Sequence, residues 1–223
     1  MRAPEIIFRD QRFVVLNKPA GLAVHPGRAG GPSVEDWFPL LSRRPDGPWL
    51  VHRLDADTAG CLLVALRKQP LLAAQTLFAS GRVEKVYWAI VKGEIVGQSG
   101  VIDAPLRRVS NALGWRMTTT AGGLAAVSEW RVLGRGAGET WLEVRPRTGR
   151  THQVRLHCRA LGAAILGDER YGSGGGALHL LARSLRVPLV PPVEAAAEPP
   201  PHMQAALTRC GWRKDQESAR DAG

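Results

Sequence analysis

The chain has 223 residues, 44% of them hydrophobic, and a formal net charge of +10, which is enough length for one core or two small lobes sharing a cleft. Its three cysteines form no CxxC pair, which argues against a disulfide framework or zinc ribbon, and no apolar run approaches the roughly 20 residues that cross a bilayer. We therefore expect a soluble, cytoplasmic protein without a membrane partner.

The first half of the chain contains signals for both strands and helices. Residues 61–66 form a continuous apolar run that is typical of an interior strand. One helix has Pro70 in its first turn, apolar residues at helical spacing, and Gly81 at its end. The other expected elements are strands at 6–8 and 13–16, an extended run at 22–24, a helix from the cap Ser33 to about residue 41, and a long β segment at 83–95.

The second half predicts more strands and two further helices. The expected elements are strands at 125–133, 141–145 and 178–187, a helix at 151–161, a Pro/Ala/Glu linker at 192–201, and a short helix at 202–210. Because strands and helices mix without a regular βαβ alternation, we expect an α+β fold. We expect it to form a single domain of residues 1–211, followed by a disordered polar tail at 212–223.

The positive charge favours an anionic partner, and nucleic acid is the commonest. Only five of the 30 basic residues are lysines, and the chain is also rich in alanine and glycine, so part of the arginine content fits GC-rich codon usage. Such compositional drift should raise acidic residues as readily as basic ones. The net charge therefore still indicates a nucleic-acid partner.

Several motif matches are better explained by structure than by chemistry. Residues 172–177 (GSGGGA) match a dinucleotide-binding pattern but lack its βαβ context, so we interpret them as a flexible loop. His152 and His157 are five residues apart and fall on different faces of a helix, which does not suit a metal pair. We expect no metal and no cofactor.

Residues 148–157 (TGRTHQVRLH) concentrate polar and cationic side chains at a helix start, where anions are favoured. Arg150, His152, Gln153 and Arg155 lie in this segment, and one of its two threonines can cap the helix. One interpretation is a solvated basic face. The other is a clamp for a phosphate or carboxylate.

Asp55 lies in the stretch VHRLDADTAGCLLVAL, between Arg53 and a turn that contains Thr58. An aspartate at this position is typical of a turn in which its side chain caps the backbone. Alternatively, Arg53 and Arg155 hold it ionised in a partly dry cleft, as a nucleophile or base requires. The stretch alone leaves both interpretations open.

Tyr87 lies in the β segment beside Lys85. Strand alternation places Lys85, Tyr87 and Ala89 on one face, and the more apolar Val86, Trp88 and Ile90 on the other. The second face is the better core candidate. Tyr87 is therefore free to stack on a nucleobase in a basic cleft.

Taken in order, the motifs resemble those of the RluA-like pseudouridine synthases, over residues 5–210. The segments that carry the resemblance are VLNKPAGLAVHPG (15–27), HRLDADTAGCLLVA (52–65), KVYWAIVKGE (85–94), RTGRTHQVRLHCRALGAAILGDERYG (147–172) and LHLLARSLRVP (178–188). HRLD and GRTHQVRLH together are highly specific. The resemblance implies a bent, mixed and mainly antiparallel sheet flanked by helices, with RNA in a central basic cleft.

The resemblance also implies a reaction in which uracil leaves its ribose, rotates and rejoins through C5, without cofactor or metal. Asp55 maps onto the catalytic aspartate, which attacks covalently or takes the 2′ proton. Tyr87 maps onto the base-stacking tyrosine, and Arg155 onto the arginine that pairs with the aspartate. Arg53 maps onto the arginine that holds the target nucleotide out of its stack. The further substrate-binding residues that we expect are His52, Thr58, Lys85, Arg150, His152 and Gln153.

Two departures from the family pattern matter. Ala59 stands where relatives commonly have serine, which removes one hydroxyl from the loop that supports Asp55. Many relatives also carry an S4-type RNA-binding domain before the catalytic motifs, which here start by residue 15. We therefore expect the catalytic domain to bind RNA on its own.

We expect a monomeric RNA pseudouridine synthase that modifies specific uridines in large-subunit rRNA or in tRNA. The alternative is a catalytically inactive RNA-binding or ribosome-assembly protein with the same fold. A metal-free nucleoside hydrolase is a weaker rival, because the net charge favours a polymer substrate. Retention of Asp55, Tyr87 and Arg155 together favours the synthase.

Overall fold

The computed structural model describes residues 3–27, 30–111 and 114–214. Its first strands are β1 (Glu5–Arg9), β2 (Phe13–Lys18), β3 (Trp49–Leu50), β4 (Ala59–Ala65), β5 (Glu84–Lys92) and β6 (Ser99–Asp103). The later strands are β7 (Leu106–Asn111), β8 (Gly114–Thr119), β9 (Val127–Gly136), β10 (Glu139–Pro146), β11 (Leu180–Val187) and β12 (Val193–Ala196). The helices are the 3-10 turn η1 (Val34–Trp37), α1 (Phe38–Leu41), α2 (Lys68–Ala79), α3 (Gln153–Ala160) and α4 (Pro201–Arg209).

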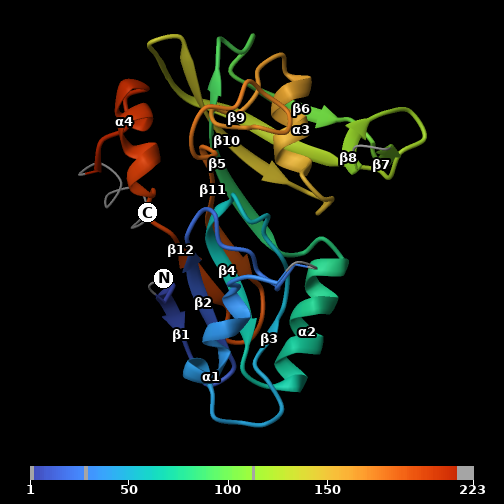
Figure 1. Ribbon diagram of the computed structural model, residues 1–223, viewed down its shortest axis with the longest axis vertical. Coiled ribbons are helices and arrows are strands. Elements are labelled where there is room, and N and C mark those ends of the chain that lie inside the picture. The colour runs from blue at the N-terminus through green and yellow to red at the C-terminus, as the bar shows by residue number, and fades with distance from the viewer. Residues whose placement is uncertain (1–2, 28–29, 112–113, 215–223) are drawn as a thin grey trace.

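Ten strands of the described chain form one mixed sheet that runs the length of the molecule (Figure 1). Its order is β1-β2-β4-β11-β5-β10-β9-β6, with β3 on β4 and β12 on β11. The β4–β11 pairing is parallel, and the other pairings are antiparallel. The hairpin β7–β8 stands apart at the right of the upper half, next to α3 (Figure 1). This confirms the α+β prediction.

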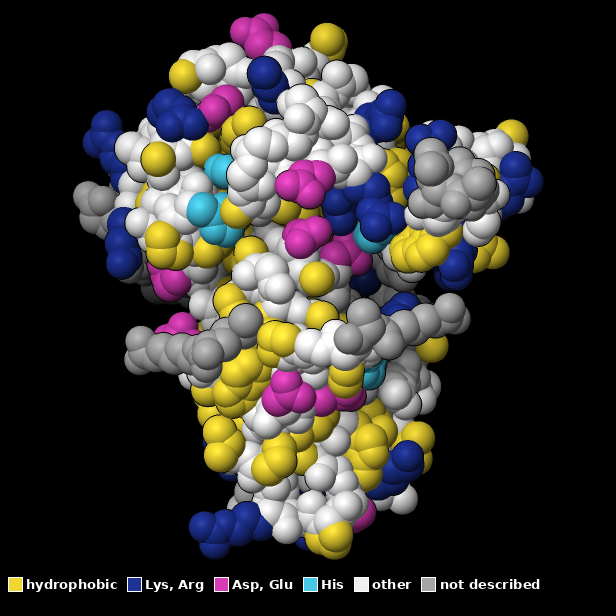
Figure 2. Space-filling view, viewed as in Figure 1, with side chains coloured by type: hydrophobic (Ala, Val, Ile, Leu, Met, Phe, Trp, Pro, Cys, Tyr) yellow, Lys and Arg dark blue, Asp and Glu magenta, His cyan; other side chains and the backbone are white. Residues whose placement is uncertain are grey.

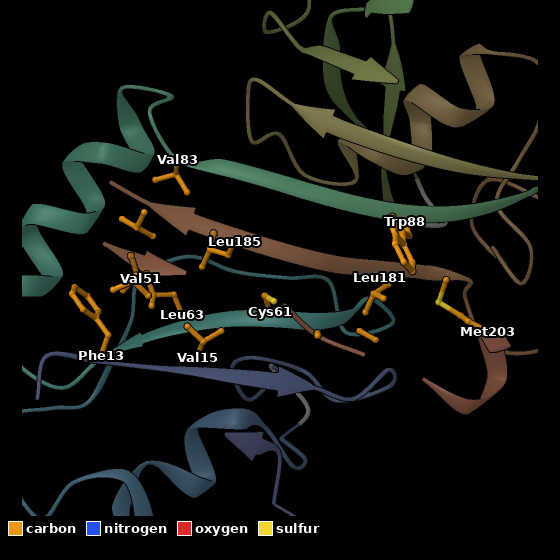
Figure 3. Packing of buried hydrophobic residues seen from close by; sticks show 14 of the residues in the cluster. Phe13, Val15, Val51, Cys61, Leu63, Val83, Trp88, Leu181, Leu185 and Met203 are labelled. Atoms are coloured by element: carbon orange, nitrogen blue, oxygen red, sulfur yellow. The ribbon is translucent and has the colours of Figure 1, made fainter. Parts of the chain in front are cut away.

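Strand β4 is buried along its whole length and contributes to two hydrophobic clusters. Ala59, Cys61 and Leu63 enter the largest cluster, together with Leu181 of β11 and Met203 of α4, as Figure 3 shows for several of these side chains. The alternate β4 residues, Leu62 and Val64, enter a second cluster on the other face. Burial on both faces explains why this strand reads as an unbroken apolar run rather than an alternating one.

Most expected elements are confirmed, but the structure corrects four of them. Residues 22–24 form no strand, and only Ala23 makes an isolated bridge to Ser33. The expected linker at 192–201 contains β12, an edge strand paired with β11. Helix α3 begins at Gln153, two residues later than expected, and His152 is its cap residue instead of Thr148 or Thr151. Residues 172–177 form a loop, as expected.

The fourth correction concerns the domain boundary at residue 211. Trp212 is only 8% exposed and packs in the largest cluster, so the packed chain extends past this position. The rest of the expected disordered tail, from residue 215 on, lies outside the described residues. Three further strands, β6, β7 and β8, were not predicted from the sequence.

Gly60 permits the close approach of β4 and β11, where Gly60 pairs with Ala182. Its φ is +109°, and a Cβ on this residue would lie 2.2 Å from the carbonyl oxygen of Ala182. A side chain here would therefore meet both backbone strain and a backbone clash. Because β4 follows the Asp55 loop directly, this contact also fixes where that loop ends.

We expect Gly60→Ala to lower the free energy of unfolding by at least about 3 kcal/mol, from strain and overpacking combined. Gly93→Ala is the matched control, because Gly93 has a φ of +110° with no atom near its added Cβ. The control should lose only about 1 kcal/mol, from backbone strain alone. Urea unfolding measures both, and equal losses would contradict the clash at Ala182.

Candidate active site

A cleft of about 490 Å³ gathers every site residue that the sequence singled out. Its walls come from the loop between β3 and β4, from β5, and from the start of α3. The expected residues that line it are His52, Arg53, Asp55, Thr58, Lys85, Tyr87, Arg150, His152, Gln153 and Arg155. Figure 2 shows Lys and Arg side chains gathered at the right of the upper half, beside a histidine and acidic side chains.

Asp55 directs its carboxylate across the cleft toward α3. Its Oδ2 lies 3.7 Å from Nη1 of Arg155, and its Oδ1 lies 3.8 Å from Nε2 of His152. The turn is closed through the backbone, because the Thr58 N–H donates to the Asp55 carbonyl at 3.1 Å. The Asp55 side chain thus faces two groups of the cleft wall, which does not fit the interpretation that it caps the turn.

Arg155 is held by a second carboxylate, which the sequence reasoning missed. Its Nε and Nη2 donate to Asp168 at 2.8 and 2.7 Å, and both side chains are almost completely buried. Burial alone would raise the pKa of Asp168, but hydrogen bonds and charge from Arg155 lower it below its usual value. Because these two hydrogen bonds use Nε and Nη2 of the guanidinium, only Nη1 is left to face Asp55.

Lys18, also missed, ties the Asp55 loop to the end of β2. Its fully buried Nζ donates to the carbonyl oxygens of Pro19, Leu22 and Ala56 at 2.7–2.8 Å. Burial lowers the pKa of Lys18 to about 7, against the raising effect of Asp57 and Asp55. Three carbonyl acceptors at these distances need three N–H donors, which only the ammonium form has.

His52 supports the floor of the cleft. Its Nε2 accepts from the Leu63 N–H at 3.0 Å, and its ring stacks on Phe78. Burial, and then the charge of Lys85, lower the pKa of His52 to about 4. His52 is therefore neutral at pH 7, and its role as an acceptor for β4 depends on that state.

Gln153 anchors the loop before α3. Its side-chain oxygen accepts from the Thr148 hydroxyl and the Arg150 N–H, and its nitrogen donates to Val127 and Ser128. The amide is thus fully engaged inside the protein. These bonds hold in place the loop that carries Arg150, whose own side chain is exposed and donates to the Ala125 carbonyl.

Tyr87 and Lys85 project into the cleft from β5. Burial raises the pKa of Tyr87, and the nearby Asp55 carboxylate raises it further, so the phenol is protonated at neutral pH. Burial lowers the pKa of Lys85, whose Nζ donates to the Thr148 carbonyl at 3.2 Å. On the opposite face of β5, Trp88 and Ile90 join the largest cluster, as the alternation predicted.

Ala59 does not face the cleft. Its side chain is buried in the largest hydrophobic cluster. Among the described residues, the only buried side-chain nitrogen or oxygen without a hydrogen-bond partner is Nε1 of Trp141. The absence of a serine hydroxyl at position 59 therefore leaves no buried side-chain oxygen of these residues without a partner. The departure from serine therefore falls on the core side of the loop.

In the described ranges, no group of three or more His, Cys, Asp or Glu side chains is arranged to hold a metal ion. Similarly, none of the described helices is both long and apolar enough to cross a membrane. The cleft itself presents the carboxylates of Asp55 and Asp57, cationic side chains and an aromatic hydroxyl.

The neutral state of His52 predicts a pH dependence of stability. Its folded pKa of about 4 lies below the unfolded value of 6.5, so its contribution is complete above pH 6.5 and is lost as pH falls through 4. The loss should total about 3 kcal/mol. The free energy of unfolding, measured with urea between pH 7 and 4, should fall less steeply with pH in His52→Gln than in the wild type. The same pH dependence in both proteins would contradict this role of His52.

The buried Arg155–Asp168 pair predicts a large loss of stability when one partner is removed. Asp168→Asn leaves the arginine charge buried without its counterion, which should lower the free energy of unfolding by about 3 kcal/mol or more. Glu129→Gln is a control, because Glu129 pairs with Arg147 on the surface and such pairs contribute about 1 kcal/mol or less. Urea unfolding measures both variants. Similar losses of free energy of unfolding in the two would contradict a larger contribution of the buried pair to stability.

The chain is similar in sequence to known proteins. The family model described as RNA pseudouridylate synthase matches residues 12–160. An uncharacterised RNA pseudouridine synthase of Zymomonas mobilis is 40% identical over 77% of this chain and 80% of its own length. The ribosomal large subunit pseudouridine synthase C of Vibrio cholerae is 36% identical, and the match spans 75% of this chain but only 52% of that protein.

Solved structures agree with the sequence comparison. The human RNA pseudouridylate synthase domain containing 4 has a TM-score of 0.77 at 27% identity and covers 92% of each chain. The human RNA pseudouridylate synthase domain containing 1 has a TM-score of 0.75 at 28% identity and covers 97% of this chain and 94% of that one. The chain therefore belongs to the RNA pseudouridylate synthase family and is an isomerase of that family.

Proposed function

We propose that the protein converts specific uridines of large-subunit rRNA to pseudouridine, with Asp55 as the catalytic carboxylate. The observation that carries the proposal is the meeting of Asp55, Tyr87 and Arg155 in one cleft, from segments far apart in the sequence. The name of the relative from Vibrio cholerae, a ribosomal large subunit pseudouridine synthase, supports large-subunit rRNA as the substrate.

The proposed reaction is an isomerisation, so its atoms balance within the nucleotide. The bond from uracil N1 to ribose C1′ breaks, a bond from C5 to C1′ forms, a proton leaves C5, and N1 gains one. Two routes start at Asp55. Its carboxylate attacks the nucleotide covalently, or it removes the 2′ proton to give a glycal intermediate.

The groups around Asp55 have separate roles in this proposal. Arg155 places a positive charge beside the carboxylate, because its Nη1 lies 3.7 Å away and its two hydrogen bonds to Asp168 hold the guanidinium in place. Tyr87 stacks on the detached uracil, and its protonated hydroxyl lies ready for proton transfer near C5. Arg53 is exposed at the edge of the cleft. Its side chain fills the place that the flipped nucleotide leaves in the stack, which offsets part of the few kcal/mol that base flipping costs.

An inactive RNA-binding protein with this fold would also explain the net charge of +10. It would not explain why Asp168 orients Arg155 toward a second, partly exposed carboxylate. A protein that only bound RNA would gain nothing from presenting a carboxylate to a polyanion. The site geometry therefore favours the enzyme over the inactive alternative.

We predict that Asp55→Asn abolishes the modification. Pseudouridine is mapped by carbodiimide in large-subunit rRNA and tRNA from cells that lack the gene and are complemented with each variant. At least one rRNA site should disappear without the gene, return with wild type, and stay absent with Asp55→Asn, whose turnover should fall by at least about 10³-fold.

Asp46→Asn is the matched control, because Asp46 is exposed and pairs only locally with Arg44. It should restore the site fully. Restoration by Asp55→Asn would contradict the catalytic role of this carboxylate. Loss of sites in tRNA alone would contradict the rRNA substrate and leave the chemistry in place.

A further inference from the structure

The His152 imidazole is enclosed by three groups at the wall of the cleft. Its Nδ1 lies 2.6 Å from the Tyr171 hydroxyl, and its Nε2 lies 3.8 Å from Asp55. The Trp115 indole stacks on the ring at 5.7 Å between centroids. The side chain is only 9% exposed, so these neighbours define its orientation.

The backbone of His152 is also held in an uncommon conformation. This residue is the cap of α3 and has a φ of +54°, in the left-handed region that non-glycine residues rarely adopt. Such strained positions persist only where the surroundings impose them, and they concentrate at functional sites. The conformation places the ring between Tyr171 and Asp55.

The hydrogen bonds around Tyr171 determine where the ring proton of His152 lies. The Met117 N–H can only donate, so the Tyr171 oxygen accepts from it, at 3.3 Å. Tyr171 is 5% exposed, and among the described residues its hydroxyl has His152 as its one acceptor. Since a buried hydroxyl proton without an acceptor is costly, Tyr171 donates to Nδ1 of His152.

A neutral imidazole that accepts at Nδ1 carries its proton on Nε2. Burial lowers the pKa of His152 against the raising effect of Asp55, and Arg155 and Arg170 lower it further. Burial also raises the pKa of Tyr171, so this tyrosine remains a donor at neutral pH. With the ring neutral, the tautomer decides whether Nε2 faces Asp55 as a donor or as an acceptor.

We propose that Tyr171 is a positioning residue that acts through His152, by fixing the tautomer whose Nε2–H faces the Asp55 carboxylate. This proposal rests on the proposed function of Asp55. The Nε2–H gives the carboxylate a second fixed donor besides Arg155, which orients its free lone pairs toward the substrate. With the opposite tautomer, a lone pair of Nε2 would face the carboxylate and repel it.

A double-mutant cycle tests this role through catalysis. Tyr171→Phe should lower kcat on the order of tenfold while the KM for RNA stays within about threefold. In the His152→Gln background the same change should cost less than about twofold, because a glutamine amide can donate toward Asp55 without any choice of tautomer. Equal costs in both backgrounds would show that Tyr171 is merely structural and would overturn the proposal.

The choice of substitution at His152 gives a second comparison. The asparagine side chain of His152→Asn keeps a polar group near Tyr171, but it is too short to place its N–H donors near Asp55. This variant should therefore be less active than His152→Gln. Asparagine tolerates the left-handed backbone better than glutamine, so folding alone would favour the opposite order. His202→Gln, which replaces a histidine bonded to the Leu178 carbonyl, should leave kcat unchanged.

The tautomer itself can be observed without any activity measurement. The ring ¹⁵N resonances of His152, assigned by their disappearance in His152→Asn, should show a protonated Nε2 and an unprotonated Nδ1. Tyr171→Phe should give a mixture of tautomers. A protonated Nδ1 in the wild type would overturn the proposal even in an active enzyme, whereas an inactive wild type with the expected tautomer would instead contradict the proposed function.

Discussion

The buried ion pair of Arg155 and Asp168 is the constraint on which the site depends. Removing two charges from water is costly unless the geometry satisfies them, and the two-pronged contact at 2.7–2.8 Å does so. Because Asp168 also accepts from the N–H groups of Arg170 and Tyr171, one carboxylate fixes both the guanidinium and the loop that carries Tyr171. Arg155 and His152 therefore reach Asp55 from a rigid wall.

Asp55 itself is positioned from the other side of the cleft by the sheet. The close parallel contact of β4 with β11 at Gly60 fixes the end of the Asp55 loop. Lys18 holds the same loop by donating a hydrogen bond to the Ala56 carbonyl. The strand β5 then carries Tyr87 into the same space. The catalytic groups that we propose thus come from the loop before β4, from β5 and from α3 (Figure 1).

The sequence predicted the strands whose side chains are buried and the residues that carry the family motifs, because both leave strong local patterns. It could not predict Asp168 as the partner of Arg155, since a contact across 13 residues depends on how the following loop folds back. The burial of Lys18 could not be predicted either, because its three carbonyl acceptors are brought together only by the fold. The hairpin β7–β8 was missed because its polar strands pair with each other outside the main sheet.

The most direct test of the account uses RNA that carries tritium at C5 of its uridines, because forming pseudouridine must release the C5 hydrogen. Purified wild-type protein should release tritium to water from large-subunit rRNA, in step with the appearance of pseudouridine. Asp55→Asn, checked to be folded, should bind the same RNA and release none above background. Tritium release by this variant at the wild-type rate would show that the carboxylate at the centre of the cleft does not perform the chemistry.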